Sequence, residues 1–577
     1  MEPPVELFDL VAQGAELHAW NSFFELAVWM RVLKWPPVPL EQWHDTAALA
    51  AAHAYPRSLE KCGQFMGMEE DSAKNKRGKY LIQRLCKPYR GERVQDFLLL
   101  QELYSYCLQD VVAERAIRQK LRPLIPLERQ AWIVDQKMNL RGIRLDSESC
   151  INAIEIIKKV EVDLNAEVHR ITNGLLSSTA SRAKSLDWIN SQGVQMDSYN
   201  KSAIVAALEG ACPPKVKRFL EIRQALSRSS TKKFQAMLDC LGQDLRAHGT
   251  MMFHAASTGR WGGKHFNPQN LPRPLEDLDV EAAINLFKHQ CAASLPGEPM
   301  EVLSSCLRGM LIAGKGRRLI VSDYSAIEAR VAAWLAGHNQ VLDAFRSNLE
   351  IYKLTASAMF GVDYEDVDKD QRFLGKIASL ALSYQGGVRA FQKMADNYGV
   401  EIDEVTALKV RDDWRTANKP IVRLWHAIEE AAKKAIKYGA VERTCAASFQ
   451  MSDGDLLCEL PSGRFISFPK PRLENNKIIY QGMNNFTHKW GDIETYGGSI
   501  FQSITQAVAR DLLVEALIKI ENANYDCILT VHDEIVSDTK KAHGSMEEFN
   551  ALMCEVPTWA KGLPVAVEGY ESKRYRK

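Results

Sequence analysis

The chain has 577 residues, enough for about three or four domains, and its 46% hydrophobic and 25% charged residues are typical of a soluble globular protein. The formal net charge of +1 predicts no partner by itself, so a nucleic-acid surface would have to come from local clusters of basic residues. Twelve cysteines without a C-x-x-C pair argue against a disulfide scaffold and a structural zinc site, and the sequence shows no secretory signal and no membrane-spanning apolar run.

The first half of the chain predicts mixed secondary structure and long helices. Within residues 1–120, helix-like stretches occur at 5–12, 21–34 and 98–120. Two more helical stretches are expected further on, at 151–172 and 214–241. The second of these is basic and amphipathic, with Ser and Thr at its centre. A solvated helix face and a phosphate-contacting surface explain its charges about equally well.

An apolar, β-branched strand is predicted at 317–324, RRLIVSDY, and it ends in Asp323. The residues from Ser325 to Glu328 then fit the S-x-x-E capping box that opens a helix, so Glu328 has a structural explanation. No capping role explains Asp323. A carboxylate at the lip of a buried strand, next to a helix start, is a typical place for a hard cation.

Residues 341–440 predict almost unbroken helix. Within them, a spacing of four places four side chains on one helix face, ahead of a Gly-Gly pair that should end the helix: Arg372, Lys376, Leu380 and Tyr384. Such a stripe fits a nucleoside triphosphate, with the cations on its phosphates, the apolar residue on its sugar and the aromatic ring beside a base. A surface helix with snorkelling Arg and Lys is the alternative.

Two hairpins and a long helix are predicted in the last part of the chain, at 458–471, 500–521 and 526–538. The second hairpin turns at His532-Asp533-Glu534, and a solvated turn is the ordinary explanation for such a triplet. If this hairpin neighbours the strand that ends in Asp323, however, Asp323 and Asp533 converge. Two carboxylates with open positions suit Mg²⁺ and predict two-metal nucleotidyl transfer on a nucleic-acid end.

Three motifs of the chain resemble motifs A, B and C of the family A DNA polymerases, the bacterial polymerase I group. They are D-Y-S-x-I-E, R-x-x-x-K followed by Tyr, and V-H-D-E, in the family's order and spacing. The resemblance covers about residues 130–577, and segments such as SYQGG give it a phage or prophage character. It implies a multidomain α/β fold of the right-hand type, with an antiparallel palm sheet and helical fingers and thumb.

The resemblance also implies a domain division. The polymerase region is expected at 121–577, after a partial RNase H-like exonuclease domain at 1–120. Within the polymerase region we expect the thumb at about 150–247, the palm at about 248–345 and 441–577, and the fingers at about 346–440.

Motifs A and C carry the implied catalytic residues. By this match, Asp323 and Asp533 hold two Mg²⁺ ions, with Mn²⁺ as an alternative, and the Tyr324 carbonyl assists. Glu534 is a further acid of the catalytic site. Glu328 is the steric gate that excludes the 2′-hydroxyl of a ribonucleotide, a role that a capping carboxylate can also fill.

Motif B carries the implied triphosphate site. Arg372 and Lys376 bind the triphosphate, and Lys376 is also the proton donor to the leaving pyrophosphate. Tyr384 abuts the templating position. Leu380 stands near the sugar, where the family usually has Phe or Tyr, and this departure puts the usual rules of sugar discrimination in doubt.

Five residues are expected to contact DNA. Arg260 resembles the family arginine that reads the primer minor groove, and Gln506 resembles the helix residue that faces the template minor groove. His532 would lie against the primer end. Lys232 and Lys233 belong to the basic helical segment, the expected thumb tip, where Ser and Lys meet backbone phosphates.

The first 120 residues carry a second resemblance, to the 3′–5′ proofreading exonucleases. AWNSFFE at 19–25 is similar to N-x-x-[FY]-[DE], and YCLQD at 106–110 to Y-x-x-x-D. Glu25 and Asp110 would then be metal ligands, and Tyr106 would orient the water. The D-x-E pair that should come earlier is absent. We expect a scaffold without exonuclease activity, unless a missing N-terminal segment or a separate chain supplies that pair.

The sequence therefore predicts a template-directed DNA polymerase that adds dNTPs to a primer 3′ end. One alternative is a non-catalytic DNA-binding protein on a polymerase scaffold, and intact Asp323, Asp533 and Lys376 argue against it. Another is a ribonucleotide polymerase, against which Glu328 argues. We expect a monomer in the cytoplasm of a bacterial host cell, with primer–template DNA and dNTPs as partners and no membrane attachment.

Overall fold

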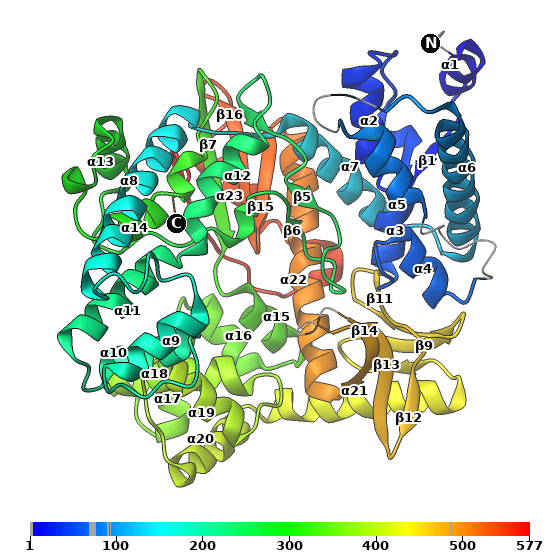
Figure 1. The fold of residues 1–577 in the computed structure, drawn as a ribbon. Coiled ribbons are helices and arrows are strands. Elements are labelled where there is room, and N and C mark those ends of the chain that lie inside the picture. Colours follow the sequence, from blue (N-terminus) through cyan, green and yellow to red (C-terminus); the bar gives the residue numbers. More distant parts are fainter. Residues whose placement is uncertain are drawn as a thin grey trace.

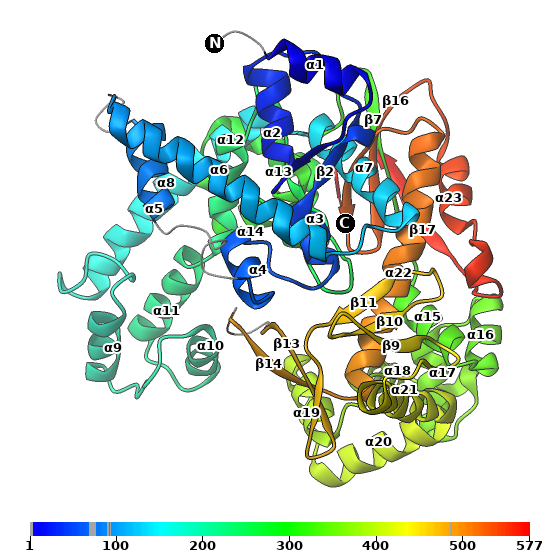
Figure 2. The same ribbon diagram turned by 90° about the vertical axis from the view of Figure 1, so that its right-hand side faces the viewer.

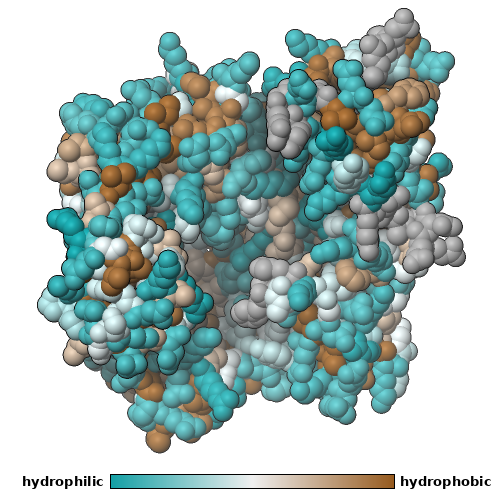
Figure 3. Space-filling view, viewed as in Figure 1, coloured by the Kyte–Doolittle hydropathy of each residue, from teal (hydrophilic) through white to brown (hydrophobic). Residues whose placement is uncertain are grey.

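The computed structural model describes residues 4–68, 77–88, 94–484 and 489–576, together with Glu92 and Thr487. Figures 1 and 2 show its ribbon from two sides. Figure 3 shows a face that is hollowed between the helices of residues 147–226 on one side and the N-terminal unit, formed by the described residues up to Lys120, on the other. In the described part of the chain, no helix is both long enough and apolar enough to cross a membrane.

A four-stranded antiparallel sheet carries the acidic residues of motifs A and C. Its strand order is β15 (Cys527–Val531), β16 (Glu534–Lys540), β7 (Arg317–Tyr324) and β17 (Val567–Ser572). The predicted strand at 317–324 and the predicted hairpin at 526–538 are therefore confirmed as neighbours. The strands β15, β16 and β7 are mostly buried, because α22 (Gly497–Asn522) and α23 (Met546–Cys554) pack against the sheet.

The helical structure predicted at 341–440 is confirmed, and it consists of six helices: α16 (Asn339–Arg346), α17 (Ile351–Phe360), α18 (Lys369–Leu382), α19 (Val388–Asn397), α20 (Glu404–Ala417) and α21 (Lys419–Tyr438). The predicted end of the motif B helix at the Gly-Gly pair is wrong, since α18 ends at Leu382. The chain already turns at Gln385, whose φ of 66° is left-handed, and Trp425 donates a hydrogen bond to the Ser383 carbonyl. Tyr384 thus lies beyond the helix.

The region expected for the thumb is helical and has its own core. Its helices are α8 (Ser147–Ile171), α9 (Arg182–Ser191), α10 (Lys201–Glu209), α11 (Pro214–Leu226) and α12 (Lys233–Asp239). Val168, Trp188 and Phe219 belong to a hydrophobic cluster separate from the main core. The single helical stretch predicted at 214–241 is wrong. It breaks at Ser227–Lys232, where the Thr231 hydroxyl bonds the Arg228 carbonyl and so competes with helical pairing.

Two further sheets fill residues 442–495, within the region expected for the palm. One is formed by β8 (Glu442–Arg443), β9 (Ser448–Ser452), β10 (Asp455–Glu459) and β11 (Phe465–Phe468); the other by β12 (Arg472–Glu474), β13 (Lys477–Met483) and β14 (Trp490–Thr495). The predicted hairpin at 458–471 is confirmed as β10 and β11. Trp490 stacks on Phe65 at 4.6 Å between ring centres, so these sheets also contact the N-terminal unit.

The N-terminal unit surrounds a small parallel sheet. Its elements are α1 (Val5–Ala12), β1 (Leu17–Ala19), α2 (Phe23–Ala27), β2 (Trp43–Asp45), α3 (Thr46–Ala52), α4 (Leu59–Phe65), α5 (Arg77–Leu81) and α6 (Phe97–Lys120). The strands β1 and β2 pair in parallel. The helices predicted at 5–12 and 98–120 are confirmed, whereas the stretch predicted at 21–34 is only α2 followed by the π-helical turn Val28–Val32.

Shorter elements connect these parts. They are α7 (Pro126–Arg141), β3 (Ile143–Arg144), β4 (Arg246–Ala247), β5 (Met251–Met252), β6 (Gly262–Gly263), α13 (Val280–Leu286), α14 (Pro299–Ser305) and α15 (Ile327–Leu335). The helix α22 packs against α7, α15 and α21, and Figure 1 shows it running through the centre of the molecule.

A buried cluster of charged side chains joins several of these elements. It contains Glu128 on α7, Arg510 and Asp511 on α22, Arg464 just before β11, and His254, each at most 3% exposed at the side chain. Arg510 pairs with Glu128, and Arg464 Nε lies 2.7 Å from Asp511 Oδ1. Burial alone would raise the pKa of Glu128, but the charge of Arg510 and the bond from His254 hold it far below its usual value. The cluster therefore favours the ionised form of the Glu128 carboxylate.

We expect Arg510→Leu to lower the free energy of unfolding by about 3–5 kcal/mol, because the substitution removes the closer of the two guanidiniums that pair with the buried Glu128 carboxylate. Arg218→Leu is the control: Arg218 pairs with Glu167 at the surface, where an ion pair contributes about 1 kcal/mol or less. Urea denaturation of both variants measures the difference.

The effect of Arg510→Leu should also depend on pH. Since the folded-state pKa of Glu128 is depressed, its stabilisation is present above the ordinary carboxyl pKa and is lost as the pH falls. The free energies of unfolding of the wild type and of Arg510→Leu should therefore approach each other as the pH falls. Equal losses for Arg510→Leu and Arg218→Leu at neutral pH would contradict the assignment.

Candidate active site

Three carboxylates meet at one end of the β15–β16–β7–β17 sheet. Asp323 is the second-last residue of β7, Asp533 lies in the tight turn between β15 and β16, and Glu534 begins β16 directly opposite Asp323. The Tyr324 N–H donates to the Asp533 carbonyl at 3.2 Å, which ties the turn to the neighbouring strand. The left-handed φ of 55° at His532 makes this turn possible. The expected convergence of the two strands is thus confirmed.

Hydrogen bonds fix the side chains of Glu534 and Tyr324 at the sheet edge. Glu534 is 1% exposed, and its Oε1 accepts a hydrogen bond of 2.7 Å from the hydroxyl of Tyr575. Burial, with the Glu534 charge beside it, raises the pKa of Tyr575, so the phenol stays a donor. The Tyr324 hydroxyl donates to the Met553 carbonyl at 2.8 Å, so its side chain points into the core. The backbone of Tyr324, not its hydroxyl, is therefore the part that can contact a ligand in the site.

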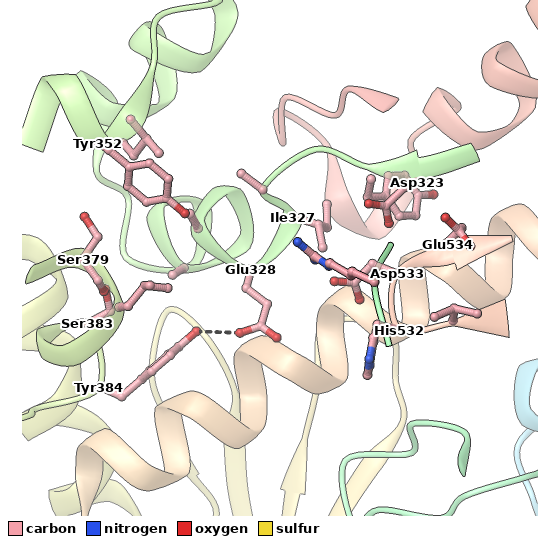
Figure 4. Close-up of a pocket in the computed structure, with 18 of the residues that line it drawn as sticks. Asp323, Ile327, Glu328, Tyr352, Ser379, Ser383, Tyr384, His532, Asp533 and Glu534 are labelled. Atoms are coloured by element: carbon pink, nitrogen blue, oxygen red, sulfur yellow. Dashed lines mark hydrogen bonds between the residues drawn. The ribbon is translucent and has the colours of Figure 1, made fainter. Parts of the chain in front are cut away.

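A cavity of about 410 Å³ lies over these carboxylates. Its floor is the sheet edge, and its opposite side is built by α15, α17 and the end of α18 (Figure 4). The sequence-predicted residues among its lining are Asp323, Tyr324, Glu328, Leu380, Tyr384, His532, Asp533 and Glu534. The cavity therefore brings together the residues of motifs A and C with the end of motif B.

The expected capping box at Glu328 is wrong. Ala326, with a left-handed φ of 48°, precedes the first residue of α15, and no side chain caps the helix. The Glu328 carboxylate instead accepts a hydrogen bond of 3.2 Å from the Tyr384 hydroxyl (Figure 4) and pairs with Arg260. Arg260 Nη2 also lies 3.5 Å from Asp533 Oδ1. One guanidinium thus links the predicted sugar gate to a predicted metal ligand.

Burial and the charges of Arg260 and Glu328 favour the neutral forms of Tyr384 and His532. Burial and the Glu328 charge raise the pKa of Tyr384 well above its usual value. Burial and the Arg260 charge lower the pKa of His532, although Asp323 opposes this shift. The ring of Tyr384 also packs 5.8 Å from that of Phe501 on α22. Tyr384 is therefore held on both sides.

The two cations of motif B lie outside the cavity. Arg372 Nε donates to Glu350 Oε2 at 2.8 Å, and Lys376 Nζ lies 5.2 Å from the centre of the Tyr398 ring. Neither residue lines the 410 Å³ space, whereas Leu380 from the same helix does. The structure thus places Arg372, Lys376 and Leu380 of the predicted stripe on α18, but it does not bring the two cations to the carboxylates.

The remaining predicted DNA contacts differ in how they are held. Gln506 is half-buried on α22, and Lys232 is exposed. Lys233 is partly buried and donates to the Asn270 carbonyl at 2.8 Å, so the chain itself already binds its ammonium group.

Two arginines of the cavity wall were missed by sequence analysis. Arg273 and Arg308 both line the cavity. Arg308 is 8% exposed; it donates to the Leu271 and Pro272 carbonyls, and its guanidinium lies 5.7 Å from the Tyr575 ring. An arginine inside the apolar run SSCLRGMLIA was the available signal, because such a residue must find buried acceptors.

The exonuclease-like residues are spread over α2 and α6. Burial, with the charges of Asp45 and Glu114, raises the pKa of Glu25 to about 7. Tyr106 is 5% exposed in a hydrophobic cluster with Leu81 and Leu103, a poor position from which to orient a water molecule. Asp110 follows on the same helix. The expected lack of exonuclease activity stays a prediction.

Comparisons with known proteins agree on one family. A family model described as DNA polymerase family A matches residues 176–452. The DNA polymerase of Bacillus phage SP02 is 36% identical over an alignment of 618 residues that covers 100% of this chain and 94% of the relative. The DNA polymerase of Mycobacterium phage D29 is 24% identical over 345 residues, covering 59% of this chain and 49% of the relative.

A solved structure supports the same fold. It is titled as the POL domain of Pol1 from M. smegmatis in complex with DNA primer-template and dNTP, and it matches with a TM-score of 0.63 at 15% identity, covering 99% of this chain and 89% of the other. Together with the acidic sheet edge and the full-length phage relative, this likeness leads to a single conclusion. The chain belongs to DNA polymerase family A and is a DNA-directed DNA polymerase with a multidomain α/β fold.

Proposed function

We propose that this polymerase adds dNTPs to the 3′ end of a primer, under the direction of a template strand, by two-metal nucleotidyl transfer. The observation that carries the proposal is the meeting of Asp323, Asp533 and Glu534 at one sheet edge, under a cavity whose other side comes from the motif B region. Carboxylates that can hold metal ions beside a substrate cavity are what two-metal phosphoryl transfer requires.

The donor atoms at this edge fit hard cations. Asp323 and Asp533 offer carboxylate oxygens, and the Tyr324 carbonyl is the one part of that residue left to the site. Such oxygen donors with open positions suit Mg²⁺, with Mn²⁺ as an alternative. When bound, two such ions supply activation of the primer hydroxyl and stabilisation of charge on the phosphates. Glu534, fixed by Tyr575, keeps the edge acidic.

The residues of α18 would bind the triphosphate. Arg372 is held by Glu350 and would have to exchange that carboxylate for a phosphate. Lys376 contacts only the face of an aromatic ring among its described interactions, so its ammonium can turn toward a phosphate and give a proton to the leaving pyrophosphate. Leu380 offers an apolar surface to the sugar.

The residues around Glu328 would select the sugar and read the primer end. Glu328 is fixed by Tyr384 and Arg260, so its carboxylate cannot easily move away from a 2′-hydroxyl. Arg260, His532 and Gln506 would contact the DNA, and Lys232 would meet the backbone of the duplex. The phage relatives support an enzyme that works on primer–template DNA in the cytoplasm of a bacterial host cell, and we propose that it does so as a monomer.

Asp323→Ala and Asp533→Ala should each reduce primer extension to background while leaving duplex binding largely intact, because affinity comes mainly from phosphate contacts elsewhere. Asp343→Ala, at an exposed position on α16, is the matched control and should extend primers normally. Extension assays and gel shifts on one primer–template measure both properties. Robust extension by either active-site variant would remove the two-metal assignment and favour a non-catalytic DNA-binding role.

Lys376→Ala should lower kcat by about 100-fold, the size of a typical general-acid contribution. Arg372→Ala should act mostly by raising KM for dNTP, because it removes a charge contact to the bound triphosphate. The control is Lys369→Ala, at the exposed start of the same helix. If steady-state kinetics change for neither α18 variant relative to this control, the stripe faces solvent throughout the reaction.

Glu328→Ala should raise ribonucleotide use relative to deoxyribonucleotide use. Tyr384→Phe should raise it less, since it removes only the hydroxyl that holds the carboxylate. Single-turnover incorporation of matched rNTP and dNTP measures the ratio. An unchanged ratio in Glu328→Ala would exclude the gate.

Because α15 has no side-chain cap, Ser325→Ala should change the free energy of unfolding by less than about 0.5 kcal/mol.

A further inference from the structure

A second set of convergent ligand atoms lies in the N-terminal unit, away from the polymerase carboxylates. His18 on β1 and His44 on β2 are direct partners in the parallel pairing, and Glu16 stands just before β1. The two imidazole rings stack with their centres 4.6 Å apart. Two imidazoles and a carboxylate therefore project from the same small region of the sheet.

The three potential ligand atoms lie close together. Glu16 Oε2 is 3.1 Å from His18 Nε2 and 3.6 Å from His44 Nε2, and all three atoms are within 4.8 Å of one another. Ligand atoms of a tetrahedral zinc ion, at about 2.0–2.1 Å from the metal, are separated by about 3.4 Å. Only small side-chain rotations would be needed to reach that geometry.

One of these atoms lacks a hydrogen bond. The buried Nε2 of His44 has no hydrogen-bond partner within the described ranges of the chain, although it faces the Glu16 carboxylate. A buried polar atom without such a partner is uncommon in a native structure and calls for an explanation. A metal ion between the two strands would give this nitrogen a ligand bond.

We propose that Glu16, His18 and His44 bind Zn²⁺ at a site separate from the polymerase active site. Two imidazoles and one carboxylate form a typical three-ligand zinc set, whereas Mg²⁺ prefers oxygen donors alone. The fourth position faces a cavity of about 510 Å³. Arg118 and Arg129 also line this cavity, so the position favours water or an anionic oxygen as the fourth ligand.

Arg118 is the main competitor for this site. Its Nη2 lies 3.7 Å from Glu16 Oε2, so a metal ion must share or displace that contact. Arg118 is 42% exposed at its side chain and can turn toward solvent or toward the anionic fourth ligand. An exposed ion pair of this kind stabilises the protein by about 1 kcal/mol or less, which is little compared with coordination by three ligands.

A bound zinc ion would stabilise the pairing of β1 with β2. The strands β1 and β2 have three residues each, and a two-stranded sheet is marginal by itself. An ion bound by residues of both strands would fasten them. The ligands escape sequence patterns because one lies 26 residues after its partner and none is a cysteine, which is why cysteine spacing had argued against structural zinc.

Zinc retention by the full-length chain tests the proposal. The chelator-treated protein is dialysed against Zn²⁺ with excess Mg²⁺, which occupies the polymerase carboxylates, and bound zinc is measured by atomic absorption. We expect about one Zn²⁺ per chain, and at least a tenfold weaker affinity in His18→Ala and in His44→Ala. His289→Ala, at an exposed histidine outside the N-terminal unit, is the matched control.

Two further measurements make the result decisive. Co²⁺ in place of Zn²⁺ should give the visible absorption of a nitrogen-ligated, four-coordinate ion in the wild type and lose it in both histidine variants. Primer extension should persist in those variants, which shows that they are folded. Zinc retention that is absent, or that both histidine variants share with the His289→Ala control, would overturn the proposal.

Discussion

The antiparallel pairing of β7 with β16 is the constraint on which the active site depends. The register sets Glu534 opposite Asp323 and brings the Asp533 turn beside the end of β7. Side chains alternate between the two faces of a strand, so a slip of one residue would carry Asp323 to the opposite face and separate the carboxylates. Both strands are buried along most of their length, so such a slip would force side chains on both faces into sites packed around other residues.

The remaining parts of the molecule hold this sheet edge in relation to the substrate cavity. The helix α22 carries Phe501, which packs on Tyr384, and Arg510, which joins the buried cluster around Glu128. Glu128 belongs to α7, which follows the N-terminal unit in the chain. The helix α22 therefore connects the cavity wall to α7. A buried carboxylate between two guanidiniums is costly to desolvate, so its contribution lies as much in fixing one arrangement of the helices as in stability.

The sequence was a good guide where a residue's role depends on local pattern, and a poor one where it depends on packing. The strand ending in Asp323, the hairpin holding Asp533 and the helices of 341–440 followed from apolar periodicity and turn residues. The capping box at Glu328 failed because Arg260 and Tyr384, both distant in sequence, compete for that carboxylate. Tyr384 left its helix because the chain turns at Gln385. Arg308 and the Glu16, His18 and His44 set are defined by contacts across elements, which no local pattern encodes.

The topology of the sheet has a consequence for synthesis of the chain on the ribosome. Val321, in the middle of β7, pairs with Val536 on one side and Tyr570 on the other, so both of its neighbours emerge more than about two hundred residues later. Domains commonly fold as they leave the ribosome, but this one cannot complete its central sheet until residues 534–540 and 567–572 have been made. Until β16 is made, this apolar strand has two unpaired edges, and one edge stays unpaired until β17 follows; such a segment is prone to aggregate. The helices of 341–440, many of which contact one another, can form during that interval.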